Sequence, residues 1–284
     1  MEDNLRDQIL VEEFKKILGS PQESGSKKEQ VVQNFLEDHS VLIPTPHRLN
    51  HRVHLSSIIS KFPLGNRYIT DYVYLTKSSD TWRVVFVELE VPDKRMFTES
   101  SNQINASAKF NEALNQVRSW QDYLKEHRQE VLKQLEPLFV PPNMRRNPVE
   151  FCFELVYGRT SEKNTEDRNR YLKLMSEQSG IKIMTYDTLI SYYENDLVLE
   201  KDIMLFKQGK FHYKKLFTKP EHVFSYIGPG DLALTNEQQE TLMQDGYEIE
   251  KWKNGEFLTH NIRYTKSTFK EQGGFSTMVS KKST

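Results

Sequence analysis

The sequence predicts an α/β fold in which a mixed central sheet is flanked by helices and followed by a small C-terminal appendage. Three observations support this. Residues 68–75 and 82–90 alternate in character around a short polar turn, which is typical of an antiparallel hairpin. Residues 149–195 alternate between strand-like and helix-like patterns. After residue 195 the chain becomes basic and aromatic, so we expect a boundary there.

Length and composition limit the class of protein. The chain has 284 residues, 37% of them hydrophobic, so it can bury one sizeable core and needs no oligomer merely to fold. No run reaches the roughly 20 apolar residues of a membrane span and the first residues are acidic, so we expect a cytoplasmic protein with no membrane partner. The single cysteine, Cys152, excludes an intramolecular disulfide framework and a Cys-rich zinc site. A net charge of −1 means that any DNA binding must use a local patch.

The N-terminal part predicts two helices. Apolar residues recur at helical spacing from Leu5 to Leu18, and Gly19 begins a stop signal, so we expect an N-terminal helix within residues 1–21. Residues 22–28 are polar and are expected to form a loop into the core, which we place at 22–195. The second helix carries Val31, Val32, Phe35 and Leu36 on one side.

The later elements follow in alternation. A long helical stripe begins after Ser107 and ends at the prolines from Pro137 onward. A buried strand at 149–157, a polar helix at 165–178, a short strand at 181–185 and a helix starting near Asp187 complete the core. We expect the appendage at 196–264 and a disordered tail at 265–284, which is rich in Ser, Thr, Lys and Gly.

The register of the hairpin brings acidic residues together. If a loop at 78–81 closes the hairpin, Asp71 faces Glu88, and Glu90 lies on the same face about 7 Å further along. Crowded carboxylates repel one another unless a cation neutralises them, and Mg²⁺ takes hard oxygen ligands. The alternative is that the two glutamates only mark the solvated end of a strand. We favour a metal site because residues 84–87 are too apolar for an exposed strand and Pro92 follows directly.

Several motifs in the expected order resemble a known superfamily. The segments ITDYV at 69–73, VFVELEVP at 85–92 and ALNQV at 113–117 resemble the core of PD-(D/E)xK nucleases, which have a restriction-endonuclease-like fold. More narrowly, the chain is similar to the Shedu antiphage nuclease family, with a G-R motif at 158–159, arginines at 168–171 and a T-Y-D-x-L motif at 185–189. The resemblance covers about residues 29–193. It implies phage defence, hydrolysis of double-stranded DNA and a homo-oligomer.

The resemblance also implies the roles of the site residues. Asp71, Glu88 and the carbonyl of Leu89 would hold Mg²⁺, with Mn²⁺ as an alternative, and Glu90 would position or deprotonate the attacking water. The usual core has lysine where this chain has Glu90. Candidates for a displaced lysine are Lys94 and Lys109, although each is also an ordinary solvated side chain.

Two further residues are expected to support this site. The resemblance implies that Gln116 orients a metal ligand or contacts a DNA phosphate; the alternative is a surface glutamine on a Gln-rich helix. Glu29 matches an additional acid in related nucleases, so we include it among the metal ligands. The alternative is a solvated glutamate on a helix rich in Lys and Glu.

Basic residues outside the carboxylate site are candidates for DNA contacts. Arg159 follows a strand and a glycine, where it could bind a phosphate or form a structural salt bridge. Asp187 is expected to cap a helix. The segment 201–219 interleaves lysines with aromatic residues, and we expect Lys210, Lys214 and Lys215 to contact phosphates. The alternative is an amphipathic hairpin with its aromatic residues packed inward.

Together these observations predict a metal-dependent DNA endonuclease. The alternative from another class is a non-catalytic DNA-binding or regulatory module that keeps the nuclease fold and has lost its lysine.

Overall fold

The computed structural model describes residues 2–20, 28–50, 52–98, 103–195, 199–220 and 222–259, and the side chains from residue 8 onward. Most of the loop expected at 22–28 and the whole tail expected at 265–284 lie outside these residues. Within them, no helix is long and apolar enough to cross a membrane.

An eight-stranded mixed sheet forms the centre of the described structure, in the order β10-β9-β8-β1-β4-β5-β6-β7. Neighbours pair antiparallel at β1/β4, β4/β5 and β8/β9, and parallel at the other four interfaces. This confirms the predicted mixed sheet. The strands are β1 (Ser57–Ser60), β4 (Tyr72–Lys77), β5 (Trp82–Leu89), β6 (Val149–Val156), β7 (Ile181–Met184), β8 (Asp202–Lys207), β9 (Lys210–Lys215) and β10 (Leu232–Ala233). A separate small pair is formed by β2 (Pro63–Leu64) and β3 (Tyr68–Ile69).

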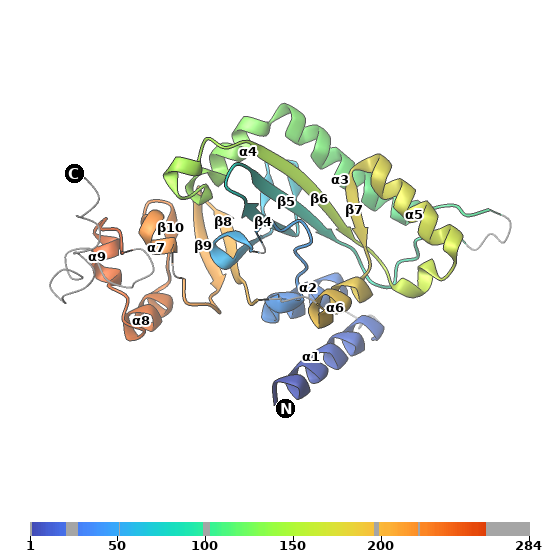
Figure 1. Cartoon of the computed structure of the whole chain (residues 1–284), viewed down its shortest axis with the longest axis horizontal. Helices are drawn as coiled ribbons and strands as arrows, with labels where there is room; N and C mark the ends of the chain where they lie inside the picture. The colour runs from blue at the N-terminus through green and yellow to red at the C-terminus, as the bar shows by residue number, and fades with distance from the viewer. Residues whose placement is uncertain are drawn as a thin grey trace.

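Helices cover both faces of this sheet (Figure 1). One face carries α3 (Ala108–Glu126), α4 (Arg128–Leu135) and α5 (Glu166–Ser179), and the other carries α1 (Glu2–Gly19), α2 (Lys28–Asp38) and α6 (Tyr186–Asn195). Near β10 lie α7 (Val223–Tyr226), α8 (Asn236–Gln244) and α9 (Ile249–Lys253). Short 3-10 turns are η1 (Ser40–Leu42), η2 (His54–Ser56), η3 (Glu136–Leu138), η4 (Pro142–Met144) and η5 (Thr160–Lys163).

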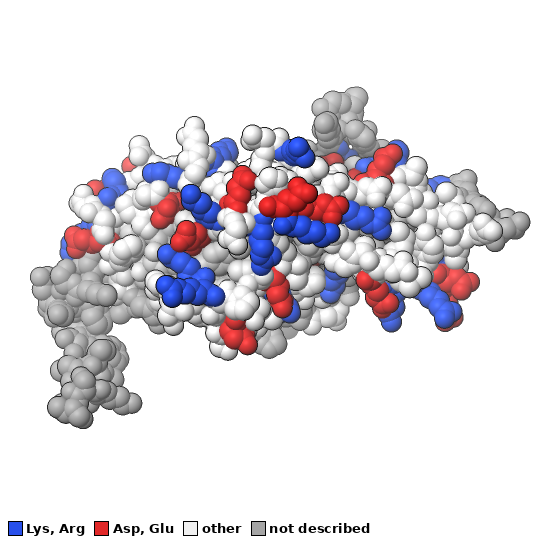
Figure 2. Space-filling model, turned by 90° about the horizontal axis from the view of Figure 1, so that it is seen from above, with Lys and Arg blue, Asp and Glu red and all other residues white. Residues whose placement is uncertain are grey.

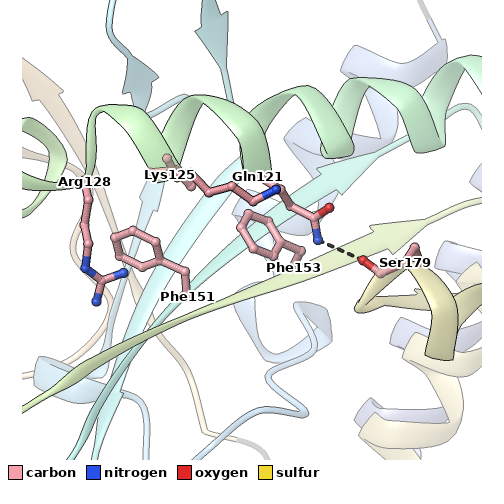
Figure 3. A pocket seen from close by; sticks show the side chains of 7 residues that line it. Gln121, Lys125, Arg128, Phe151, Phe153 and Ser179 are labelled. Carbon is pink, nitrogen blue, oxygen red and sulfur yellow. Dashed lines mark hydrogen bonds between the residues drawn. The ribbon is translucent and has the colours of Figure 1, made fainter.

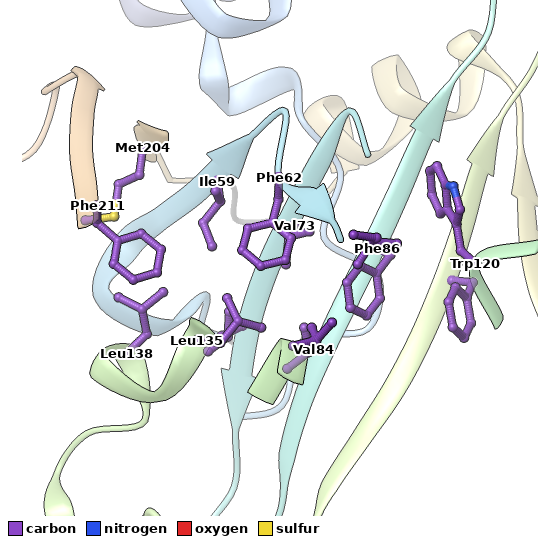
Figure 4. Close-up of a cluster of buried hydrophobic side chains, with 14 of the residues drawn as sticks. Ile59, Phe62, Val73, Val84, Phe86, Trp120, Leu135, Leu138, Met204 and Phe211 are labelled. Atoms are coloured by element: carbon purple, nitrogen blue, oxygen red, sulfur yellow. The ribbon is translucent and has the colours of Figure 1, made fainter. Parts of the chain in front are cut away.

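The two layers of helices create two hydrophobic cores. Val84 and Phe86 of β5 belong to the core under α3, which also contains Trp120 (Figure 4). Val85 and Val87 of the same strand belong to the core under α1, α2 and α6. Because β5 is buried on both faces, its residues 84–87 form a continuous apolar run. The acids at its end therefore interrupt a buried strand.

The hairpin register agrees with the prediction, but the first strand does not. Lys77 pairs with Trp82 and Val73 with Phe86, as expected. The continuous strand expected at 68–75 was wrong, since Tyr68–Ile69 pairs with Pro63–Leu64 and β4 begins at Tyr72. The break arises because the backbone N–H of Thr70 donates to Phe62 O at 3.0 Å, which draws this segment away from β5.

The sheet also continues across the boundary expected at residue 195. Strand β8 pairs in parallel with β1, a central strand that the sequence analysis did not identify. In β9 the side chains of Phe211 and Tyr213 are buried, while Lys210 and Lys214 point outward. This is the amphipathic hairpin given above as the alternative for segment 201–219. The division of the chain into domains stays a prediction.

Candidate active site

The three predicted acids lie at one end of the sheet, where β4 begins and β5 ends. Their residues are buried, with exposed fractions of 4% for Asp71, 7% for Glu88 and 9% for Glu90. Their contacts come from three different elements: the turn after β1, helix α3, and the loop after β5. A buried carboxylate needs such partners, because desolvation strongly disfavours its charge.

Asp71 links the turn after β1 to the end of β5. Its Oδ1 accepts a hydrogen bond from Lys61 Nζ at 2.5 Å, and its Oδ2 accepts one from the backbone N–H of Leu89 at 2.7 Å. The backbone N–H of Lys61 also donates to Asp71 O at 2.9 Å, and Lys61 has a left-handed φ of 51°. Non-glycine residues are uncommon in this region, which is often occupied at functional sites. Sequence reasoning missed Lys61.

Glu88 is contacted by helix α3. Gln116 Nε2 donates a hydrogen bond to Glu88 Oε1, which brings Gln116 to the site, while its role there stays a prediction. The Gln116 residue itself is exposed, whereas Trp120, one turn later, is fully buried. The glutamine is thus at the surface, and it still orients a buried carboxylate.

Glu90 is held by its side chain and by its backbone. Lys94 Nζ contacts Glu90 Oε2, which places one of the two candidate lysines at the site. Lys109, the other candidate, is exposed on the first turn of α3. The hydroxyl of Tyr186 donates to the carbonyl oxygen of Glu90 at 2.7 Å. Helix α6 therefore helps to fix the end of β5.

Burial and neighbouring charges raise the pKa values of Glu88 and Glu29. Burial raises the pKa of Glu88 well above its ordinary value, and the charges of Asp71, Glu90 and Glu29 raise it further. Burial and the charge of Asp71 likewise raise the pKa of Glu29, and Lys61 partly offsets this. Glu29, on the first turn of α2, is therefore close enough to sense the same charges.

A hard divalent cation fits the chemistry of this cluster, because it consists of buried oxygen donors that repel one another. Among the described residues, however, no three His, Cys, Asp or Glu side chains are grouped as a ready metal site. Lys61 and Lys94 instead neutralise Asp71 and Glu90. To bind a cation together, the carboxylates would have to turn from these lysines. The role of the Leu89 carbonyl as a ligand stays a prediction.

Two motifs separated in sequence meet beside this site. Arg159 Nε lies 3.1 Å from each carboxylate oxygen of Asp187, and its Nη2 lies 2.8 Å from Oδ1. The backbone N–H of Thr160 donates to Asp187 Oδ2 at 2.6 Å. Although burial acts to raise it, these hydrogen bonds hold the pKa of Asp187 below its ordinary value. Arg159 is thus engaged in a salt bridge, the alternative stated above, and Asp187 lies in the first turn of α6.

The three lysines predicted to bind DNA lie on β9, and two of them contact α2. Lys214 forms an ion pair with Glu37, and Lys215 forms one with Asp38. Lys210 Nζ lies 3.4 Å from the carbonyl oxygen of Pro229. On the face shown in Figure 2, basic and acidic side chains are interspersed. The DNA contacts of these lysines stay a prediction.

Comparison with known protein families identifies the family of this chain. A family model described as Shedu protein SduA, C-terminal, matches residues 26–190, which is more than half of the chain. The matched segment contains the carboxylate cluster, Gln116 and the Arg159–Asp187 pair, and it ends before β8. A search of curated proteins found no match.

Proposed function

The chain belongs to the family of the Shedu protein SduA, C-terminal, and from this premise we propose that it is a metal-dependent DNA endonuclease of antiphage defence with a PD-(D/E)xK core. One observation supports the catalytic part of the proposal most strongly. Three acids are buried at the end of a sheet, where each has a polar partner from a different element. We further propose Mg²⁺ or Mn²⁺ as cofactor, double-stranded DNA as substrate and a homo-oligomeric assembly.

The proposed mechanism assigns a task to each acid. Asp71, Glu88 and the Leu89 carbonyl would hold the cation, with Glu29 as a further oxygen donor. Mg²⁺, when bound, would lower the pKa of a coordinated water molecule and would neutralise negative charge on the phosphate. Glu90 positions the attacking water or accepts its proton.

Neighbouring residues hold these acids in place. Gln116 orients Glu88 through its hydrogen bond, and the backbone N–H of Leu89 orients Asp71. Lys61 and Lys94 bring two ammonium groups to a site that has no lysine at position 90. Either ammonium group can contact a phosphate once it leaves its carboxylate, because a phosphate is an equally suitable anionic partner.

A second candidate function also has an observation in its favour. Lys61 and Lys94 already neutralise Asp71 and Glu90, so two of the three acids are balanced without a metal ion. Such a site suits a non-catalytic DNA-binding or regulatory module.

Incubation of the purified protein with DNA distinguishes the two candidates. Linear and closed-circular duplexes are incubated with Mg²⁺, with Mn²⁺ and with EDTA, and the products are separated on a gel. The nuclease proposal predicts cleavage of the closed circle with either cation and none with EDTA. Binding without cleavage under all three conditions would favour the regulatory module.

A further inference from the structure

A cavity of about 540 Å³ lies between helix α3 and the edge of strand β6 (Figure 3), and none of the three acids lines it. It opens there because β7 pairs with β6 only from Phe153 onward, so in the described structure the first residues of β6 pair with β5 on one side and lack a strand on the β7 side. The cavity is lined by Gln121, Leu124, Lys125, Arg128, Phe151, Phe153 and Ser179. Its volume is in the range of about 300 to 1,000 Å³ that is typical of small-molecule sites.

The floor of the cavity is aromatic. The rings of Phe151 and Phe153 are supported from behind by Phe86, at centroid distances of 5.5 and 5.7 Å. Phe151 is only half-buried, so part of its surface faces the cavity. A rigid aromatic surface of this kind can stack against another planar ring.

The rim of the cavity is basic. The guanidinium of Arg128 lies over part of the Phe151 ring, 4.3 Å from its centroid, and Lys125 extends across the opening (Figure 3). Arg128 also donates a hydrogen bond to Val149 O, and Lys125 pairs with Asp122 at 2.8 Å on the exposed surface. None of the seven lining residues is acidic. The lining therefore favours a ligand that is both aromatic and anionic.

We propose that this cavity binds a nucleotide. Its base would lie against the exposed part of Phe151, beside the buried Phe153, and its phosphate would lie at Lys125 and Arg128, since aromatic surfaces with neighbouring basic groups bind unpaired nucleotides by stacking and charge. The side-chain amide of Gln121, which donates to Ser179 O at 3.0 Å, lies at the side of the floor and presents polar groups to a base edge (Figure 3).

The cavity and the carboxylate cluster share two elements. Phe153 pairs with Phe86, and Glu88 follows two residues later on the same face of β5, a step of about 7 Å. Gln116 and Gln121 lie on the same helix, α3. If the proposed nuclease function holds, the nucleotide belongs to an unpaired part of the substrate strand, because a base inside a duplex cannot reach a pocket without leaving the stack.

The test uses binding without catalysis. Fluorescence anisotropy in EDTA measures the Kd of the full chain for a labelled single-stranded dT12 at low salt. Phe151→Leu keeps an apolar side chain and removes the aromatic ring, and Lys125→Gln removes an exposed charge. Each should weaken binding by about tenfold, the loss expected for one stacked base or one charged contact. The matched controls Phe257→Leu and Lys133→Gln, both at exposed residues outside the cavity, should stay within about twofold of the unaltered chain.

Thermal unfolding establishes that the variants are folded, and the exposed Lys125 still provides the test if Phe151→Leu fails to fold. Competition by dAMP identifies the source of the ligand: displacement of dT12 supports a site for a free nucleotide, and loss of dT12 binding in the variants without displacement supports a site for a strand. Equal dT12 affinity in folded variants and the unaltered chain would overturn the proposal. Because no cleavage is measured, its failure is distinguishable from failure of the nuclease proposal.

Discussion

The hydroxyl of Tyr186 donates a 2.7 Å hydrogen bond to the carbonyl oxygen of Glu90, and the Tyr186 residue is fully buried. The adjacent Asp187 binds Arg159, so one turn of α6 connects the end of β5 to the loop after β6. The T-Y-D-x-L and G-R motifs therefore have a structural role. They fix the backbone from which Glu90 extends.

Tyr186→Phe tests this role. The variant leaves a buried carbonyl oxygen without its donor, which costs about 1 to 3 kcal/mol of unfolding free energy. Urea unfolding should show this loss, and the control Tyr192→Phe, a partly buried tyrosine on the same helix, should show much less. Equal stability of the two variants would mean that the hydrogen bond does not hold β5.

Gly158→Ala tests how closely the loop after β5 approaches Gly158, which follows β6. Gly158 has a φ of +60°, and an added Cβ would lie 2.9 Å from the backbone oxygen of Lys94. Gly209 has a similar φ of +76°, but its added Cβ would meet nothing within 4 Å. Both substitutions incur the left-handed backbone cost of about 1 kcal/mol.

Gly158→Ala should therefore lower the Tm more than Gly209→Ala, and the difference reports the contact with Lys94. If the two variants have the same Tm, the loop after β5 moves away from the added Cβ without loss of stability.

Glu88→Gln should stabilise the metal-free protein at neutral pH. The folded-state pKa of Glu88 is raised by burial and by Asp71, so between the unfolded and folded pKa values the folded state binds more protons. Stability of the unaltered chain should therefore fall as pH rises through this window. The variant lacks this term, so its advantage should be largest at pH 8 and should vanish near pH 4.5, measured by urea unfolding in EDTA. If the stability of Glu88→Gln and that of the unaltered chain depend on pH in the same way, the pKa of Glu88 is not raised in the folded state.

The lysines of β9 should contribute unequally to DNA binding. Lys214 and Lys215 are paired with Glu37 and Asp38, so they neutralise fewer phosphates than solvated lysines would. Each contact that remains contributes about 0.9 to the slope of log affinity against log salt. The change of Lys210, Lys214 and Lys215 together to Gln should flatten the slope, and Asp38→Asn should steepen it by freeing Lys215. If neither slope changes, the lysines of β9 do not contact DNA.

Local patterns predicted the hairpin well. A four-residue turn between two runs of alternating residues fixes the register, so Asp71, Glu88 and Glu90 could be placed together from the sequence. The resemblance to a family implied that Gln116 orients a metal ligand or contacts a DNA phosphate, but helical spacing alone does not say which strand a helix covers, so the contact with Glu88 came from the structure.

Other parts of the site depend on tertiary contacts that have no local pattern. The only sequence signal of β1 is a pair of isoleucines between two serines, too short to distinguish a strand from a loop. Lys61 follows β1 directly, and its link to Asp71 depends on where that strand pairs. The lysines of β9 resembled a DNA-binding segment because their acidic partners lie on α2, far away in sequence.

The most direct test of the proposed catalytic site is the initial rate at which a supercoiled plasmid is nicked in Mg²⁺, by the unaltered chain and by Glu88→Gln. Glu112→Gln serves as the control, since Glu112 is exposed on α3. Loss of a metal ligand should reduce the rate by a factor of at least about 100, comparable to the loss of a major electrostatic contribution to catalysis, while Glu112→Gln keeps the rate. A Glu88→Gln protein that nicks DNA as fast as the unaltered chain would contradict the assignment of this cluster as the catalytic centre.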